Sequence, residues 1–198
     1  LAAARWYEKE GMIDQALNKL ISEGEVNQAA ELVKAHAHAE FLKGVGKVNT
    51  WLNKLPHELI ENNPSLLLLT AWHAFGQFNL GKIPPILEKL RRLIKDTEPD
   101  SQVLSELNFF EGNFQYWMGD TEGSIETLSK ALENGSSLPS HVRCNIELVL
   151  AFAKQRNGAY DAITCELNSR ISESDQSEEI DRAYLYGSLA FVQLLSAK

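Results

Sequence analysis

Apolar residues recur every three or four positions along almost the whole chain, and strict alternation of apolar and polar residues is nearly absent. This spacing places apolar side chains on one face of an α-helix, so it predicts an all-α fold in which strands are not needed. Near the N-terminus, Gly11 and Gly24 interrupt the pattern. We therefore expect a helix over about residues 1–10, followed by short helices that begin near Ile13 and Val26.

The segment between His36 and Asn63 is less regular. Its apolar pattern predicts a helix over about residues 45–55 that ends before Pro56, because proline lacks an amide donor and restricts the residue before it. Proline is well tolerated at the first position of a helix, so a second short helix is expected over residues 56–61.

From residue 64 onward the pattern predicts a series of helix pairs. The turn inside each pair contains Gly81, Gly119 or Asn157-Gly158, and the interval is 38 residues from Gly81 to Gly119 and again from Gly119 to Asn157. The predicted pairs are 65–80 with 82–96, 100–118 with 121–134, and 139–156 with 159–172, and a last helix is expected over 177–196.

Each pair also carries small residues where its two helices are expected to cross. The turn glycines allow the chain to reverse, because glycine tolerates backbone conformations that other residues avoid. A small residue in the first helix lets the second helix approach closely, and a small or apolar residue early in the second helix packs back into the crossing. These residues are Ala74 with Ile86, Gly112 with Ser124, and Ala151 with Ala162.

A fixed interval of this kind indicates a stacked repeat array. We predict a right-handed superhelix of tetratricopeptide-like helical hairpins, one continuous solenoid over residues 64–198, preceded by a region of short helices over residues 1–63. Such arrays form extended surfaces that bind partners, and they rarely form compact catalytic sites.

Composition and charge narrow the function classes. The 198 residues carry a net charge of −8, and neutralising phosphates requires clustered Lys and Arg, so direct nucleic-acid binding is not expected. No apolar run approaches the ~20 residues that span a bilayer, and the first residues do not form a signal peptide. Two cysteines, Cys144 and Cys165, lack metal-type spacing. We therefore expect a cytoplasmic protein with reduced thiols and no contact with a membrane.

The sequence does not predict an enzyme. His36 and His38 are two residues apart and so point in different directions on a helix, which excludes them as a metal pair. The segment His57-Glu58-Leu59-Ile60-Glu61 lacks the second histidine of a zinc-protease motif. No catalytic residue and no metal ligand is therefore expected, and an enzyme domain is the least favoured of the alternatives.

The first half of the chain carries a more specific pattern. It runs Ala2-Ala3-Ala4-Arg5-Trp6, Gly11-Met12-Ile13-Asp14-Gln15-Ala16, Gly24-Glu25-Val26-Asn27-Gln28-Ala29, Trp51-Leu52-Asn53-Lys54-Leu55-Pro56, Asn63-Pro64 and Ala71-Trp72. Over about residues 1–95 this order resembles the large ATP-dependent LuxR-type bacterial regulators of the MalT kind. The match falls where their nucleotide-binding part gives way to a tetratricopeptide-like sensor region, and the remainder matches only as generic helical repeats.

The resemblance implies that this chain is a sensor or interaction segment of a longer protein, with residues 1–63 joining an ATPase part to the array. ATP is implied for the full-length regulator only, because Gly44-Val45-Gly46-Lys47 lacks the spacing and hydroxyl residue of a phosphate-binding loop. No cofactor is expected in this segment, and DNA contact is implied for a C-terminal domain outside it. The implied partners are a small-molecule inducer or a regulatory protein, with possible self-association.

In tetratricopeptide-like pairs the first helices line the concave groove. Counting from the turn glycines places aromatic and polar side chains there, which suit stacking and hydrogen bonding to a ligand or a peptide. Two alternatives stay open: the phenylalanines pack between repeats, or the array is a protein–protein scaffold without a small-molecule ligand. The predicted groove residues are Phe75, Phe78, Asn79, Glu106, Phe109, Asn113, Tyr116, Trp117, Phe152, Gln155 and Arg156.

Overall fold

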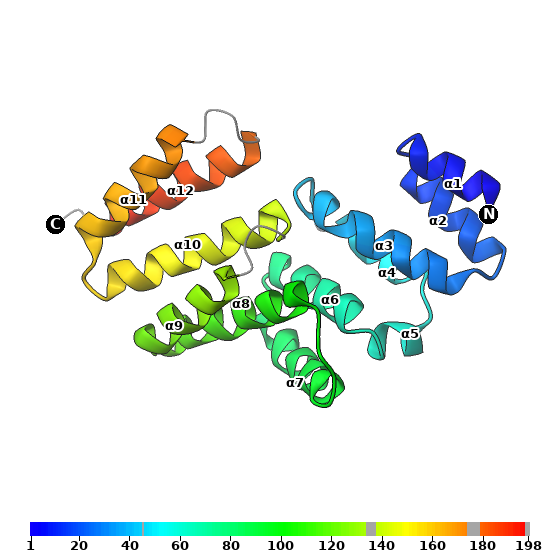
Figure 1. Ribbon diagram of the computed structural model, residues 1–198, viewed down its shortest axis with the longest axis horizontal. Helices are drawn as coiled ribbons and strands as arrows, with labels where there is room; N and C mark the ends of the chain where they lie inside the picture. The colour runs from blue at the N-terminus through cyan, green and yellow to red at the C-terminus, as the bar shows by residue number, and fades with distance from the viewer. Residues whose placement is uncertain (45, 134–137, 174–178, 197–198) are drawn as a thin grey trace. The chain divides into compact units, whose positions relative to one another are not determined.

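In the computed structural model, the secondary structure of the described residues is entirely helical, which confirms the predicted all-α class (Figure 1). The structure describes residues 1–44, 46–133, 138–173 and 179–196. The helices are α1 (Ala2–Lys9), α2 (Ile13–Ser22), α3 (Val26–Phe41), α4 (Gly46–Leu52), α5 (His57–Glu61), α6 (Pro64–Gly76), the 3-10 helix η1 (Leu80–Lys82), α7 (Ile83–Ile94), α8 (Ser101–Met118), α9 (Thr121–Leu132), α10 (Ser140–Arg156), α11 (Tyr160–Glu173) and α12 (Glu179–Ser196).

The helices form two compact units, unit 1 over Leu1–Pro99 and unit 2 over Asp100–Lys198. The boundary between the units follows Pro99. One core cluster of unit 1 runs from Ala4 in α1 to Leu69 in α6, so α6 packs with the preceding short helices as well as with α7. The superhelical arrangement of the pairs stays a prediction.

In unit 1, local signals fix where α6 begins and why it is buried. The Asn63 side chain accepts a hydrogen bond from the amide of Leu66 at 3.1 Å, and Pro64 occupies the first turn, where its missing donor costs nothing. The following run Leu66-Leu67-Leu68-Leu69 is buried on all sides. A helix that is apolar all round is a core helix, and α6 accordingly contacts α3, α4, α5 and α7.

Trp51 joins helices α4 and α2 of unit 1. Its side chain in α4 has no exposed surface, and its indole Nε1 donates a hydrogen bond to Asp14 Oδ1 of α2 at 2.7 Å. Lys47 Nζ lies 3.4 Å from Asp14 Oδ2 and 3.3 Å from Glu40 Oε2 of α3. The hydrogen bond from Trp51 lowers the pKa of Asp14 below its usual value, so this carboxylate is charged at neutral pH and holds α4 against α2.

Because of His38 in α3, the stability of unit 1 depends on pH in the mildly acidic range. Burial lowers its pKa from 6.5 to about 4, so the folded state binds this proton less readily than the unfolded chain. Unfolding therefore takes up a proton between these two values, and the free energy of unfolding falls as the pH decreases. We expect a loss of about 2 kcal/mol between pH 7.5 and pH 5, measured by urea denaturation at the two pH values.

His38→Gln should remove most of that loss, since glutamine does not titrate. The matched control is His36→Gln, because His36 lies two residues away and pairs with Glu8 on the surface. If His38→Gln kept the full pH dependence while His36→Gln abolished it, the assignment to His38 would be wrong.

In unit 2, the helices α8 and α9 cross closely at Gly112 of α8. A Cβ atom on Gly112 would lie 2.6 Å from Leu128 Cγ in α9, so only glycine allows this approach. The Ser124 hydroxyl, fully buried, donates to the carbonyl oxygen of Gly112 at 2.8 Å. The predicted pairing of Gly112 with Ser124 is confirmed. Gly119 ends α8 with φ +89°, in the left-handed region that favours glycine.

Two predictions about the other pairs are wrong. Gly81 does not reverse the chain, because α6 already ends at Gly76, Phe78 adopts the positive φ of 55°, and Gly81 lies in the short helix η1. Ala162 is exposed, and its neighbour Ile163 is the residue that packs into the core of α10, α11 and α12. By contrast, Gly158 takes the expected turn conformation with φ +87°.

Among the described residues, no helix is both long enough and apolar enough to cross a membrane. The same residues contain no group of three or more His, Cys, Asp or Glu side chains arranged to hold a metal ion.

Candidate functional site

The predicted groove residues are divided between the two units. Phe75, Phe78 and Asn79 lie at the end of α6 in unit 1. Phe75 is half-buried and meets Trp72 edge-on, with ring centroids 5.8 Å apart. Phe78 is 89% exposed, and Asn79 is exposed beside it. The remaining eight residues belong to unit 2.

Three of those eight have almost no accessible surface. Phe109 is fully buried, and its ring packs against Phe110 at 5.1 Å. Glu106 is 2% exposed and accepts a hydrogen bond from Gln102 Nε2 at 2.8 Å. Asn113 is also buried. These side chains stabilise the interior of unit 2, and they do not line an open surface.

Three of the other predicted residues, Tyr116, Trp117 and Phe152, belong to a row of aromatic rings that crosses α8, α10 and α12. Trp117 and Tyr116 of α8 pack edge to face at 5.4 Å, and Tyr116 lies 6.4 Å from Phe152 of α10. Phe152 in turn stacks on Phe191 of α12 at 4.2 Å. We call these four residues the aromatic row. Trp117 is 68% exposed, so the outer end of the row is open to solvent.

Arg156 lies beside the aromatic row at the end of α10. Its guanidinium carbon is 5.7 Å from the centroid of the Tyr116 ring, within range of a cation–π interaction. Its Nη1 donates to the carbonyl oxygen of Tyr116 at 3.2 Å. The same carbonyl accepts a hydrogen bond from the Gly119 amide at 3.2 Å. It lies in the last turn of α8, where the helix dipole favours a positive charge. Arg156 thus links α8 to α10 and fixes the orientation of Tyr116.

A cavity of about 410 Å³ opens between α10 and α12 at the inner end of the row. We call it the C-terminal cavity. Its lining is almost entirely apolar, and the polar atoms on it are few. The residues that line it are Leu148, Phe152, Ala183, Tyr184, Gly187, Ser188 and Phe191. The Ser188 hydroxyl donates to the carbonyl oxygen of Tyr184 at 2.8 Å, which leaves its oxygen free to accept.

The row and the cavity share Phe152 and Phe191, so together they form one continuous candidate site. Ring faces stack on sugars, planar rings or apolar side chains, and Arg156 adds one fixed cation at the edge. The arrangement suits binding. The residues that line it include no pair of acid and base groups that would transfer a proton.

The prediction from sequence did not include the residues that α12 contributes. Tyr184, Gly187, Ser188 and Phe191 recur at intervals of three and four residues, which places them on one face of a helix. This spacing is the sequence signal that could have identified the contribution of α12. Since α12 has no following helix in the repeat pattern, counting from the turn glycines did not reach it. Gln155, the remaining predicted residue, is half-buried on α10.

The described residues of this chain form an all-α fold that carries an aromatic row beside an apolar cavity. Comparison with known proteins relates it to part of a transcriptional regulator. Over 135 residues it is 24% identical to the HTH-type transcriptional regulator MalT of Serratia proteamaculans (strain 568), a match that covers 67% of this chain and 15% of the regulator. No protein-family model matches the chain, and no solved structure gives a significant match.

Proposed function

We propose that this chain is the sensor or interaction segment of a cytoplasmic MalT-like transcriptional regulator and that it binds an inducer at the aromatic row and the C-terminal cavity. The observation that carries the proposal is the continuous aromatic surface of α8, α10 and α12, open at Trp117 and adjoining a cavity of about 410 Å³. The similarity to MalT supports the regulatory context, and the residues of the site support the binding role.

The mechanism follows from where the site lies within unit 2. The aromatic row connects α8 to α12 through α10, so a ligand seated on it contacts helices of successive pairs. Such a ligand shifts the balance between a resting and a self-associating form of the regulator only if it binds the two forms with different affinity. Under this proposal ATP use and DNA binding belong to other parts of the regulator, and this segment has no catalytic role.

Trp117→Ala in the intact regulator is expected to reduce inducer-dependent reporter expression about tenfold at a subsaturating inducer concentration. An exposed aromatic side chain contributes stacking and apolar contact to a ligand, and its loss weakens binding by roughly this factor. Because Trp117 is 68% exposed, the core of unit 2 is unaffected. The dose–response curve of the reporter measures the effect as a shift of the half-maximal concentration.

Met118→Ala is the matched control, since Met118 is the next residue of α8 and is 85% exposed without belonging to the aromatic row. It should leave the dose–response curve unchanged. An unchanged curve for Trp117→Ala would refute the assignment of the site.

A protein–protein scaffold is the second candidate function. The observation that favours it is the exposure of large apolar side chains in unit 2, with Met118 at 85% and Leu194 at 71%. Where such side chains lie together, the exposed apolar surface marks a protein interaction site. Under this alternative a protein partner binds with equal affinity to wild type and Trp117→Ala, and Leu194→Ser or Met118→Ser releases it.

A further inference from the structure

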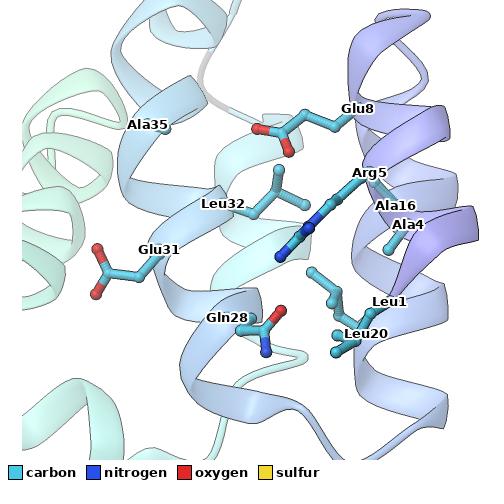
Figure 2. A pocket seen from close by; sticks show the side chains of 10 residues that line it. All are labelled: Leu1, Ala4, Arg5, Glu8, Ala16, Leu20, Gln28, Glu31, Leu32 and Ala35. Atoms are coloured by element: carbon cyan, nitrogen blue, oxygen red, sulfur yellow. The ribbon is translucent and has the colours of Figure 1, made fainter.

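A second cavity lies in unit 1, in a cleft between the hairpin of α1 and α2 and the helix α3 (Figure 2). Its volume is about 390 Å³, within the range of roughly 300–1,000 Å³ that small-molecule sites occupy. The aliphatic residues that line it are Leu1, Ala4, Ala16, Leu20, Leu32 and Ala35. The buried ones, Ala4, Ala16, Leu20 and Leu32, form its floor. The polar side chains that line it are Arg5, Glu8, Gln28 and Glu31.

The two carboxylates of the cleft already have partners on α3. Glu8 Oε1 lies 3.2 Å from His36 Nε2, which joins α1 to α3 across one end of the cleft. Glu31 Oε1 lies 2.7 Å from Lys34 Nζ on the surface of α3. Each carboxylate is thus engaged with a side chain of α3, and neither pairs with the arginine of the cleft.

Arg5 is the cation that remains available. Within the part of the chain that the structure describes, its guanidinium makes no hydrogen bond and no ion pair. Its side chain extends from α1 toward α3, so that the guanidinium projects over the cleft (Figure 2). A planar guanidinium presents a fork of N–H donors that matches the two oxygens of a carboxylate.

We infer that this cleft binds a small aliphatic carboxylate, with the carboxylate on Arg5 and the hydrocarbon chain on the floor of Ala4, Ala16, Leu20 and Leu32. Three features select this class. No aromatic side chain lines the cleft, so a hydrocarbon chain fits better than a planar ring that needs stacking. One available guanidinium matches one negative charge. The carboxylates of Glu8 and Glu31 at the rim disfavour a dianion such as a phosphate monoester, because like charges repel.

The bound carboxylate bridges two elements that are otherwise weakly joined. The helix α1 packs on α2, and its side-chain link to α3 is the exposed Glu8–His36 pair. A ligand held by Arg5 and by Leu32 adds a second link between α1 and α3. This inference uses unit 1 alone, so it stands or fails separately from the inducer site proposed in unit 2.

The test is a titration of the 198-residue chain, labelled with ¹⁵N, with hexanoate, 1-hexanol and hexylamine, followed by amide chemical shifts. Hexanoate should produce saturable shifts at Arg5, Leu20, Gln28 and Leu32. Hexanol has the same hydrocarbon chain but no charge, and hexylamine carries a positive charge in place of the negative one. Both should therefore bind at least tenfold more weakly than hexanoate. Arg5→Gln should weaken hexanoate binding at least tenfold, and Arg5→Lys should weaken it less, because lysine keeps the charge but loses the fork.

Arg92→Gln is the matched control, because Arg92 is an exposed arginine of the same unit that pairs with Glu88 and lies outside the cleft. It makes the same change in net charge and should leave hexanoate binding intact. Four results would each overturn the inference. Hexanoate and hexanol bind equally well, or Arg5→Gln binds hexanoate as tightly as wild type. Alternatively, the amide shifts are confined to the C-terminal cavity, or no shift appears at the highest soluble concentration.

Discussion

Trp51→Ala is expected to destabilise unit 1 by about 3–5 kcal/mol, the range for removing a large aromatic side chain from a core. Trp51 has no exposed surface, and it packs in the core that runs from α1 to α6. The substitution leaves a cavity and also leaves Asp14 without its indole donor. A buried or half-buried carboxylate that loses a hydrogen bond adds to the cost.

Native-state hydrogen exchange distinguishes a local effect from a general one. Amides of α2, α3 and α4 should exchange faster in Trp51→Ala, whereas amides of α8, α9 and α10 in unit 2 should keep the wild-type rates. Chemical denaturation followed by circular dichroism gives the size of the effect. Equal acceleration in both units would show that the loss is not confined to the core around Trp51.

Trp51→Phe separates packing from hydrogen bonding. Phenylalanine keeps most of the apolar contact but removes the Nε1 donor to Asp14, so the expected loss is about 1–2 kcal/mol. The pKa of Asp14 should also rise toward its ordinary value, since the hydrogen bond from Trp51 is the main reason that it is lowered. A loss as large as that of Trp51→Ala would mean that the indole ring shape, and not the hydrogen bond, dominates.

Local sequence signals predicted the fold where one residue decides the geometry. Gly119 had to be glycine because the chain takes a positive φ there, and Asn63-Pro64 marked the beginning of α6 because both residues suit the start of a helix. The same reasoning did not predict the turn after α6. There the positive φ falls on Phe78, and the short helix η1 separates the turn from α7. An aromatic residue rarely adopts this conformation, so no local signal pointed to it.

The candidate site was predictable only in part, for a related reason. Counting from a turn glycine indicates which residues share one face of a helix, and it picked out Tyr116, Phe152 and Arg156. In the structure the Tyr116 ring lies near both Phe152 and Arg156. Phase does not tell which neighbouring element covers a residue. Phe109 and Glu106 have the phase of groove residues, yet both are buried in unit 2. The contribution of α12 depends on tertiary packing and has no counterpart in the repeat pattern.

Gly112→Val is expected to destabilise unit 2 by about 3 kcal/mol, at the upper end of the range for overpacking a core. A Cβ atom at this position would lie 2.6 Å from Leu128 Cγ, 2.9 Å from Leu128 Cδ2 and 3.4 Å from the Leu128 amide nitrogen. Leu128 is fully buried, so its side chain has little room to move, and α9 itself must shift. That shift also strains the hydrogen bond from Ser124 to the Gly112 carbonyl. Thermal or chemical denaturation of the 198-residue chain measures the loss.

Gly187→Ala in α12 is the matched control, because a Cβ atom there meets nothing within 4 Å. Alanine favours a helix over glycine by up to about 1 kcal/mol, so this variant should gain stability, whereas Gly112→Ala should lose about 1–2 kcal/mol despite the same propensity gain. Because the two variants should change the free energy of unfolding in opposite directions, their difference gives the steric cost of a methyl group at the helix crossing. Shortening Leu128 to alanine should then cost less in the Gly112→Ala background than in wild type, since the added methyl occupies part of the vacated space. Additive losses would show that Leu128 is not the residue that glycine accommodates.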